Sequence, residues 1–285
     1  MAATLIDGVA IARELYSGFR QRVQSLAGRG VQPGLAAIVV GDNPASEVYV
    51  RTKTRACAEV GVHSSQHRFG TACTADEVIE LIRRLNADPA IHGILVQLPL
   101  PSHLDAERVL QAVAAHKDVD GFNWCNLGAL VAGHPRFAPC TPLGVMTMLD
   151  HEKIAVEGRT AVVIGRSVIV GKPMALMLIA RRATVTVCNS KTPNLRDYTT
   201  RADILIVAAG KPGIITGAML KPGAVVIDVG INRLPDGKLA GDVDFASASQ
   251  VASRITPVPG GVGRLTVAML IANTILAAER SSAQP

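Results

Sequence analysis

Aromatic residues are scarce in this chain, which holds one Trp, three Tyr and five Phe among its 285 residues. A hydrophobic core must therefore be built from Ala, Val, Ile and Leu. Apolar residues still make up 48% of the chain, a share that excludes a disordered protein. Aliphatic cores of this kind are typical of parallel sheets covered by helices. The length is sufficient for two domains, each with a core of its own.

Cysteine is also rare, and its spacing excludes two classes of protein. The five residues are odd in number and form no CxxC pair; they are Cys57, Cys73, Cys125, Cys140 and Cys188. This argues against a disulfide framework and a zinc ribbon, and it indicates free thiols in a reducing compartment. The opening MAATLIDGVA lacks the basic region and apolar stretch of a signal peptide. No apolar run approaches the roughly 20 residues of a membrane helix, so we expect a cytoplasmic protein with no membrane partner.

The charge of the chain is positive but dispersed. The formal net charge is +6 and the isoelectric point is about 9.3. No run of five or more Lys and Arg occurs, which argues against a nucleic-acid-binding arm. A basic balance still attracts anions. We therefore expect small phosphorylated or carboxylated ligands rather than nucleic acid.

Strand and helix patterns alternate along the first half of the chain. Apolar periodicity predicts a helix over 9–26, and LAAIVV predicts a buried strand from residue 35. Pro44 suits the first turn of a second helix, and Thr74 with Glu77 forms a capping box before a third. A strand over 91–99 and a helix over 106–116 follow. This alternation favours a mainly parallel sheet.

The second half of the chain continues the alternation. Thr141 and Pro142 suit the start of a helix that reaches about His151, and four short apolar strands follow in a doubly wound series; they cover residues 160–165, 184–188, 202–210 and 224–230. The pattern predicts a two-domain α/β fold with the active site in the cleft between the domains. We expect an N-terminal α/β substrate domain over 1–139, to which a C-terminal helix over 265–285 returns, and a Rossmann-type nucleotide-binding domain over 140–264.

The turn after the first strand of the second domain is the candidate pyrophosphate site. It contains Gly165, Ser167, Gly171 and Pro173. The spacing is not GxGxxG, but an apolar strand enters the turn and a helix leaves it. Such a turn offers backbone N–H groups and a helix dipole to an anion. A plain turn with a helix-capping glycine explains the same residues, and the turn alone does not decide between the two.

The end of the next strand distinguishes the two nicotinamide dinucleotides. NAD-binding sheets carry an acid there that holds the ribose 2′-hydroxyl. Here Asn189, Ser190 and Lys191 follow the strand, and Arg166 follows the first glycine. Arg166 and Ser190 suit a 2′-phosphate, which an acid would repel. This favours NADP as the cofactor, whereas Lys191 alone is explained by a solvated charge.

A second group of polar residues lies in the first half of the chain. Tyr49 and Lys53 are four apart on an expected helix, so they share a face. Gln97 ends the strand ILVQ, and Asp118 and Asp120 lie in the loop KDVDG. Strand ends and loops are where open α/β sheets bind ligands. Without other evidence, a Tyr and a Lys on one helix face more often have a packing or solvent-exposed role than a catalytic one.

Long motifs in a fixed order give this chain a resemblance to one family. They are VGDNPAS..YV..K, ILVQLPLP, KDVDGF, PCTP.G, GRS..VGKP.A, KPGAVVIDVGIN, GDVDF and ITPVPGGVG. They resemble the bifunctional methylenetetrahydrofolate dehydrogenase/cyclohydrolases over nearly the whole chain. The resemblance implies oxidation of 5,10-methylenetetrahydrofolate by NADP and hydrolysis of the methenyl product to 10-formyltetrahydrofolate. These are steps of one-carbon metabolism that serve purine biosynthesis.

The resemblance also implies roles for individual residues. Lys53 is the catalytic lysine, Gln97 orients it, Tyr49 stacks on the aminobenzoate ring and Asp120 holds the pterin. The folate site further includes Leu98, Pro99, Pro259, Gly260, Gly261 and Gly263, and the NADP site includes Gly165, Arg166, Ser167, Gly171, Pro173, Ser190 and Ile231. The family forms homodimers through the nucleotide domain, and no metal is implied.

The chain departs from the family at three places. Asn123 and Trp124 stand where His-Pro is common, Arg264 and Leu265 where Pro-Met is common, and Asn189 where a His is common. These changes leave open the ratio of the two activities. Two alternatives therefore remain: an NADP oxidoreductase of the shikimate dehydrogenase type, and a divergent paralogue with one activity or with binding alone. His63 and His67 could flank a metal, but no third ligand is evident.

Overall fold

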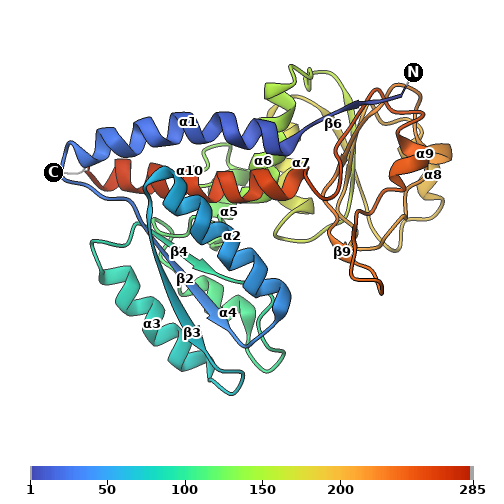
Figure 1. Ribbon diagram of the computed structural model, residues 1–285. Helices are drawn as coiled ribbons and strands as arrows, with labels where there is room; N and C mark the ends of the chain where they lie inside the picture. Colours follow the sequence, from blue (N-terminus) through green and yellow to red (C-terminus); the bar gives the residue numbers. More distant parts are fainter. Residues whose placement is uncertain (1, 283–285) are drawn as a thin grey trace. The chain divides into compact units, whose positions relative to one another are not determined.

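A computed structural model describes residues 2–282 of the chain (Figure 1). Its contacts divide the chain into two units. The six-stranded unit consists of residues 1–13 and 141–266, and the three-stranded unit of residues 14–140 and 267–285. The sequence had assigned residues 1–13 to the first domain. They belong instead with 141–266, because β1 (Thr4–Leu5) pairs in parallel with β11 (Arg254–Ile255).

The sheet of the six-stranded unit is entirely parallel. Its strand order is β1-β11-β8-β7-β5-β6. Besides β1 and β11 it contains β8 (Val225–Asp228), β7 (Ile204–Val207), β5 (Thr160–Ile164) and β6 (Thr184–Cys188). All residues of β7 and β8 are buried, as expected for a parallel sheet covered on both faces. The doubly wound prediction is confirmed.

Short helices and one hairpin complete the six-stranded unit. The helices are α6 (Cys140–His151), α7 (Gly171–Ala180), α8 (Leu195–Thr199), η1 (Gly217–Met219) and α9 (Phe245–Ala248). The strands β9 (Asn232–Arg233) and β10 (Leu239–Ala240) pair antiparallel. The core beneath them is aliphatic and includes Val162, Leu205, Val226 and Ile255.

The three-stranded unit holds a parallel sheet of order β3-β2-β4. These strands are β2 (Gly34–Val40), β3 (His63–Phe69) and β4 (Gly93–Val96), and every residue of β2 is buried. The helices are α2 (Pro44–Val60), α3 (Ala75–Ala87), α4 (Ala106–Gln111) and α5 (Trp124–Val131). The predicted capping box of α3 is confirmed, because Glu77 N donates to Thr74 Oγ1 at 3.3 Å and Thr74 N donates to the Glu77 carboxylate at 2.7 Å.

Two long helices belong to both units. The division falls within α1 (Gly8–Ala27), after Arg13, and within α10 (Val262–Ser282), after Thr266. By length and composition α10 could cross a membrane, since its apolar stretch has a mean hydropathy of 1.4. However, 67% of that stretch is buried inside the protein, as in the core helix of a soluble domain. The helix expected over 106–116 ends at Gln111, and β3 was not expected at all.

Candidate functional site

A hydrogen bond joins Lys53 to Gln97 in the three-stranded unit. Lys53 lies in the third turn of α2, and Gln97 directly follows β4. The Lys53 ammonium donates to Gln97 Oε1 at 3.0 Å, and Gln97 Nε2 donates to the carbonyl of Leu98 at 2.7 Å. The backbone N–H of Gln97 donates to the carbonyl of Ile38 at 2.9 Å, which extends the sheet by one bond. The amide oxygen is therefore held toward the lysine by a side chain that adds no charge.

Asp120 and Cys140 stand beside this pair. Asp120 is half-buried, and its burial raises the pKa of the carboxyl while the positive charge of Lys53 lowers it. Cys140 is fully enclosed, and burial raises the pKa of its thiol well above the usual range, so it remains protonated. The thiol donates a hydrogen bond to the carbonyl of Val119 at 3.2 Å, and the Asp120 carboxyl lies beside it. The site thus combines one cation, one carboxylate and the neutral side chains of Gln97 and Cys140.

The loop that carries Asp120 is fixed from within by Asp118. The buried Asp118 carboxylate accepts hydrogen bonds from Gly121 N at 3.1 Å, Asn123 N at 2.7 Å and Asn126 Nδ2 at 2.8 Å. Burial raises the pKa of Asp118, and these donors lower it. Asp118 is a structural residue, because all its described contacts are hydrogen-bond donors from the loop and from α5. Within residues 2–282 no three metal-ligating side chains come together.

Asn273 of α10 holds the same loop from outside. Its Nδ2 donates to the carbonyl of Val119 at 2.8 Å and to that of Ala138 at 3.2 Å. Asn273 is buried and belongs to the three-stranded unit. Sequence analysis did not identify this residue, since nothing in the local pattern of the helix distinguishes an inward-facing amide.

The remaining residues assigned to the folate site are distributed over both units. Tyr49 is half-buried on α2, one turn before Lys53, as the spacing predicted. Leu98 and Pro99 are joined by a cis peptide bond immediately after Gln97. Pro259, with its cis bond to Val258, and the three glycines after it belong to the six-stranded unit.

The glycine loop after β11 is closely packed within its own unit. A Cβ at Gly261 would lie 2.5 Å from the carbonyl oxygen of Pro257, and one at Gly8 would lie 2.2 Å from that of Gly261. A Cβ at Gly263 would come within 3.3 Å of the Ile231 side chain. This loop therefore requires residues without a side chain, and it places the exposed Ile231 against Gly263.

The turn between β5 and α7 also depends on its two glycines. Gly165 has a φ of +124°, and a Cβ there would lie 2.2 Å from the carbonyl oxygen of Ala208. A Cβ at Gly171 would lie 2.2 Å from the carbonyl oxygen of Gly165. Both positions bring backbone against backbone, so any other residue would force the turn open.

The backbone donors at the start of α7 are used within the turn. Ser167 Oγ accepts the N–H of Val170 at 3.2 Å and that of Gly171 at 3.3 Å. The Ser167 carbonyl accepts the N–H of Lys172 at 3.0 Å, and Pro173 has no N–H to offer. No described residue accepts the backbone N–H groups of residues 166–169, so these are the donors of the turn that are left for an anion.

Arg166 and Ser190 lie at the ends of neighbouring strands. Ile164 and Cys188 are partners in the parallel pairing of β5 with β6, and Gly165 N donates to the Cys188 carbonyl at 2.8 Å. Arg166 and Ser190 each come two residues after these partners, and both are exposed. Arg166 makes no hydrogen bond or ion pair with any other described residue. An uncompensated guanidinium beside a hydroxyl fits a phosphate group.

Two buried carboxylates that the sequence analysis missed organise the loops at the same edge of the sheet. Asp242 accepts the backbone N–H groups of Ala209 at 2.6 Å, Gly210 at 2.8 Å and Lys211 at 2.9 Å. Asp228, the last residue of β8, accepts the N–H of Gly230, of Asp242 and of Val243 at 2.9, 3.0 and 2.9 Å. The motifs IDVG and GDVD therefore contain structural carboxylates.

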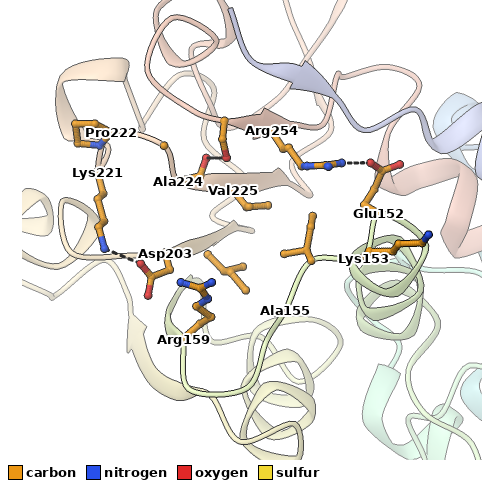
Figure 2. A pocket seen from close by; sticks show the side chains of 14 residues that line it. Glu152, Lys153, Ala155, Arg159, Asp203, Lys221, Pro222, Ala224, Val225 and Arg254 are labelled. Atoms are coloured by element: carbon orange, nitrogen blue, oxygen red, sulfur yellow. Dashed lines mark hydrogen bonds and ion pairs between the residues drawn. The ribbon is translucent and has the colours of Figure 1, made fainter. Parts of the chain in front are cut away.

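One concavity of the six-stranded unit is a poor candidate for the cofactor site. Figure 2 shows this space of about 330 Å³, which lies at the beginnings of the strands. Two of its four cations are paired: Lys221 Nζ lies 2.6 Å from Asp203 Oδ1, and Arg254 pairs with Glu152. Open α/β sheets bind ligands at the carboxyl ends of their strands. No residue of the predicted cofactor set lines this concavity.

Two of the departures from the family pattern have structural roles. Asn123 caps α5, since its Oδ1 accepts the N–H of Cys125 at 2.9 Å, and its Nδ2 donates to the carbonyl of Val113 at 2.9 Å. Asn189 Oδ1 accepts the N–H of Lys191 at 2.9 Å and so closes a turn after β6. Arg264 is exposed in the first turn of α10, and no contact in the structure explains it.

A doubly wound parallel sheet with a glycine turn, in one chain with a lysine–glutamine pair on a smaller α/β unit, defines a class of nucleotide-dependent enzymes. Two family models refine that class. The catalytic domain of tetrahydrofolate dehydrogenase/cyclohydrolase matches residues 6–120, and the NAD(P)-binding domain of the same family matches residues 139–282. The chain belongs to the tetrahydrofolate dehydrogenase/cyclohydrolase family.

Individual relatives agree with this assignment over their whole length. A protein of Nitrosospira multiformis named bifunctional protein FolD is 60% identical, covering 100% of this chain and 99% of its own. A crystal structure of the bifunctional enzyme FolD from Campylobacter jejuni is 48% identical with a TM-score of 0.96, covering 98% and 100% of the two chains.

Two further structures bear on the cofactor and on the alternatives. A Trypanosoma brucei FolD complexed with NADP and an inhibitor is 38% identical with a TM-score of 0.95, covering 99% of each chain. A shikimate dehydrogenase of Peptoclostridium difficile is 12% identical with a TM-score of 0.51, covering 86% of this chain and 92% of its own. The second likeness shows the fold alone, so it does not support the shikimate alternative.

Asp228 predicts a pH dependence of stability that a variant can isolate. Burial raises the pKa of Asp228 to about 6. The folded protein therefore binds this proton more tightly than the unfolded chain, whose Asp titrates near 4. The stabilisation of the fold by this proton is fully present below about pH 4 and is lost as the pH rises through 6. We expect the free energy of unfolding of wild type to fall by about 2–3 kcal/mol over that window relative to Asp228→Asn.

Denaturant unfolding at several pH values checks this expectation. Asp203 provides a control of opposite sign, because Lys221 and other partners lower the pKa of its carboxyl. Asp203→Asn should remove stability that wild type gains as the pH rises. Parallel profiles for wild type and Asp228→Asn would show that the Asp228 carboxyl titrates normally in the fold.

Proposed function

We infer that this chain oxidises 5,10-methylenetetrahydrofolate to the 5,10-methenyl form with NADP and then hydrolyses that product to 10-formyltetrahydrofolate. The family of the chain and the whole-length likeness to bifunctional relatives support both reactions. The observation that carries the proposal is the hydrogen bond of 3.0 Å between Lys53 Nζ and Gln97 Oε1 in the catalytic domain.

The proposed chemistry needs one amine that can take up a proton and several positioning groups. When bound, NADP accepts the hydride that leaves the methylene carbon of the folate. The folate is then an amidinium cation, which water attacks at the same carbon. Lys53 in its neutral form holds this water and accepts its proton, which passes to N5 when the bond between that carbon and N5 breaks and leaves 10-formyltetrahydrofolate. Gln97 directs the amine without favouring its protonated form, as an acid in its place would, and Asp120 accepts N–H groups of the pterin.

Removal of the Lys53 amine tests this assignment. We expect Lys53→Met to lose hydrolysis of methenyltetrahydrofolate by at least about 100-fold, as for a general base. The decay of methenyl absorbance measures the rate. Gln97→Leu leaves the amine in place but undirected, so its loss should be smaller.

Arg55→Met is the matched control, since Arg55 is an exposed cation on the same helix. This variant should hydrolyse the methenyl compound at the rate of wild type. Near-normal hydrolysis in a folded Lys53→Met protein would exclude Lys53 as the base, although the family membership would stand.

The preference for NADP rests on Arg166 and Ser190. The 2′-phosphate is the one group that distinguishes NADP from NAD, and Arg166 is the exposed guanidinium at the end of β5. We expect Arg166→Ala to raise the KM for NADP roughly 10- to 100-fold, the loss of one charge-assisted contact, with little change in the KM for NAD. Lys191→Ala should change neither value much, because that side chain is a solvated charge.

Initial rates with both dinucleotides measure this preference. If Arg166→Ala raised the KM for NADP and the KM for NAD equally, the guanidinium would contact a part of the cofactor other than the 2′-phosphate. If neither KM changed, Arg166 would not belong to the cofactor site.

A monofunctional paralogue is the second candidate function. Arg264 remains its only support, because Asn123 is explained by its cap on α5. The ratio of dehydrogenase to cyclohydrolase rates at one enzyme concentration decides between the two. A measurable rate for only one reaction would favour the paralogue.

The compartment and the oligomeric state are further parts of the proposal. Among the described residues all five cysteines are free thiols, which suits a reducing cytoplasm. The position of β6 supports a homodimer through the nucleotide domain. This strand is at the edge of a parallel sheet, and parallel sheets are normally buried by other parts of the protein. Val187 on β6 is 40% exposed, and Ile179 at the end of α7 is 55% exposed.

The dimer predicts a specific effect of charge at this edge. Wild type should have twice the chain mass of 29.8 kDa in solution. Val187→Lys combined with Ile179→Glu should shift the mass toward that of one chain, measured by light scattering after gel filtration. Val131→Glu is the control, since Val131 is 67% exposed on the other unit. A dimer that survives the double variant would locate the interface elsewhere.

A further inference from the structure

The three-stranded unit has a pocket at the beginnings of its strands. Its volume is about 590 Å³. The walls come from the segment between α1 and β2, the segment between α3 and β4, residues 116–117 and the end of α10 (Figure 1). His92 precedes β4 and Gln97 follows it, so the pocket is about 16 Å from the Lys53–Gln97 pair at 3.3 Å per residue.

His92 presents one donor to this pocket. Its side chain is only 8% exposed and lines the pocket. Gly34 N donates to His92 Nδ1 at 3.1 Å, and His92 N donates to the Gly34 carbonyl at 2.8 Å. Since Nδ1 accepts a hydrogen bond, the neutral ring carries its proton on Nε2. Burial and the nearby Lys117 lower the pKa of His92, which keeps the ring neutral. No hydrogen bond joins Nε2–H to another residue among 2–282, and since no buried side-chain nitrogen of the described residues is left unpaired, this donor is open to the space of the pocket.

Lys117 adds a buried positive charge to the same wall. It is 7% exposed, and its ammonium donates to the carbonyls of Leu85 at 3.0 Å and Asp88 at 2.6 Å. Both acceptors are neutral, and no carboxylate among the described residues forms an ion pair with this ammonium; burial lowers the pKa of Lys117, and the charge of the Asp88 carboxylate raises it from beyond ion-pair distance. An ammonium has three donors, so one remains uncommitted. A buried charge without an ion pair is costly unless a ligand compensates it.

The other walls restrict the chemistry of a ligand. Val31, Pro89, Ile91 and Ala277 line part of the pocket with apolar surface, and Gln32, His116, Ser281 and Ser282 line another part. A phosphate has oxygens on all sides, some of which would face the apolar part, whereas a carboxylate presents two oxygens on one end. We propose that this pocket binds a small carboxylate whose two oxygens accept hydrogen bonds from Lys117 Nζ and His92 Nε2 and whose apolar body packs against these walls.

Calorimetric titration with cyclohexanecarboxylate tests the proposal in the absence of folate and NADP. The matched neutral probe is cyclohexanecarboxamide. We expect one carboxylate to bind per chain, at least about tenfold more tightly than the amide, which cannot pair with the ammonium. Equal binding of acid and amide, or no binding of the acid, would overturn the proposal. Inorganic phosphate that binds as tightly as the acid would also overturn it, since the apolar walls would then have no role.

Variants locate the binding site. Lys117→Met should weaken the acid at least tenfold, but Lys117 also joins two carbonyls at the end of α3. Ala90→Trp therefore serves as a second variant: Ala90 is exposed and lines the pocket, so an indole there fills the space and leaves both donors intact. Ala87→Trp places the same group at an exposed position outside the pocket.

We expect Ala90→Trp to lose binding and Ala87→Trp to retain it. Lys53→Met should bind the acid as wild type does, which separates this pocket from the folate site. Unchanged binding in Ala90→Trp, or its loss in Lys53→Met, would refute the assignment to this pocket. Neither result depends on whether the chain carries the activity proposed above.

Discussion

Buried carboxylates that accept backbone N–H groups are the interaction on which the loops of this protein depend. Asp228 and Asp242 each accept three or more hydrogen bonds, mostly from segments that follow strands, and Asp118 accepts three from the loop between α4 and α5 and from α5 itself. A loop at a strand end carries N–H groups that no neighbouring strand satisfies, and a carboxylate supplies acceptors without needing a donor of its own. The loops that carry functional side chains are therefore fixed before any ligand binds.

The surroundings of Lys53 show a different use of polar groups. Its direct partner is an amide, and the carboxylate of Asp120 acts on it only through space. An acid in place of Gln97 would form an ion pair and favour the charged amine. The amide orients the amine and places no second charge in direct contact with it. Cys140 is a neutral neighbour of Asp120, so it adds no third charge beside Lys53 and Asp120.

Local patterns in the sequence predicted those elements that local chemistry determines. The helix α3 was predicted because Thr74 and Glu77 satisfy its first turn by themselves. The strand β3 was missed because HSSQHRF has neither apolar alternation nor an apolar run. Its pairing with the buried β2 makes it a strand, and that partner is distant in sequence. Residues 1–13 were counted with the first domain for the same reason, since β11, the partner of β1, is distant in sequence.

The residues of the candidate site also include some that the sequence predicted and some that it did not. The pairing of Lys53 with Gln97 across 44 residues came from a family resemblance, and the side-chain geometry agrees with it. The self-capping of the glycine turn by Ser167 was not foreseen, because a serine after a glycine equally suits a ligand contact. Asp242 and Asn273 were not identified because their partners are backbone atoms 31 to 154 residues away.

The contribution of Asn273 to the Asp120 loop has a consequence for how the chain is made. The loop is synthesised long before the helix that holds it, since 153 residues separate Asp120 from Asn273. Until α10 leaves the ribosome, the carbonyls of Val119 and Ala138 lack their amide donor. Most of the three-stranded unit precedes residues 141–266 in the chain but reaches its final form only after α10 has been made, so during that interval the nascent protein holds an unfinished domain.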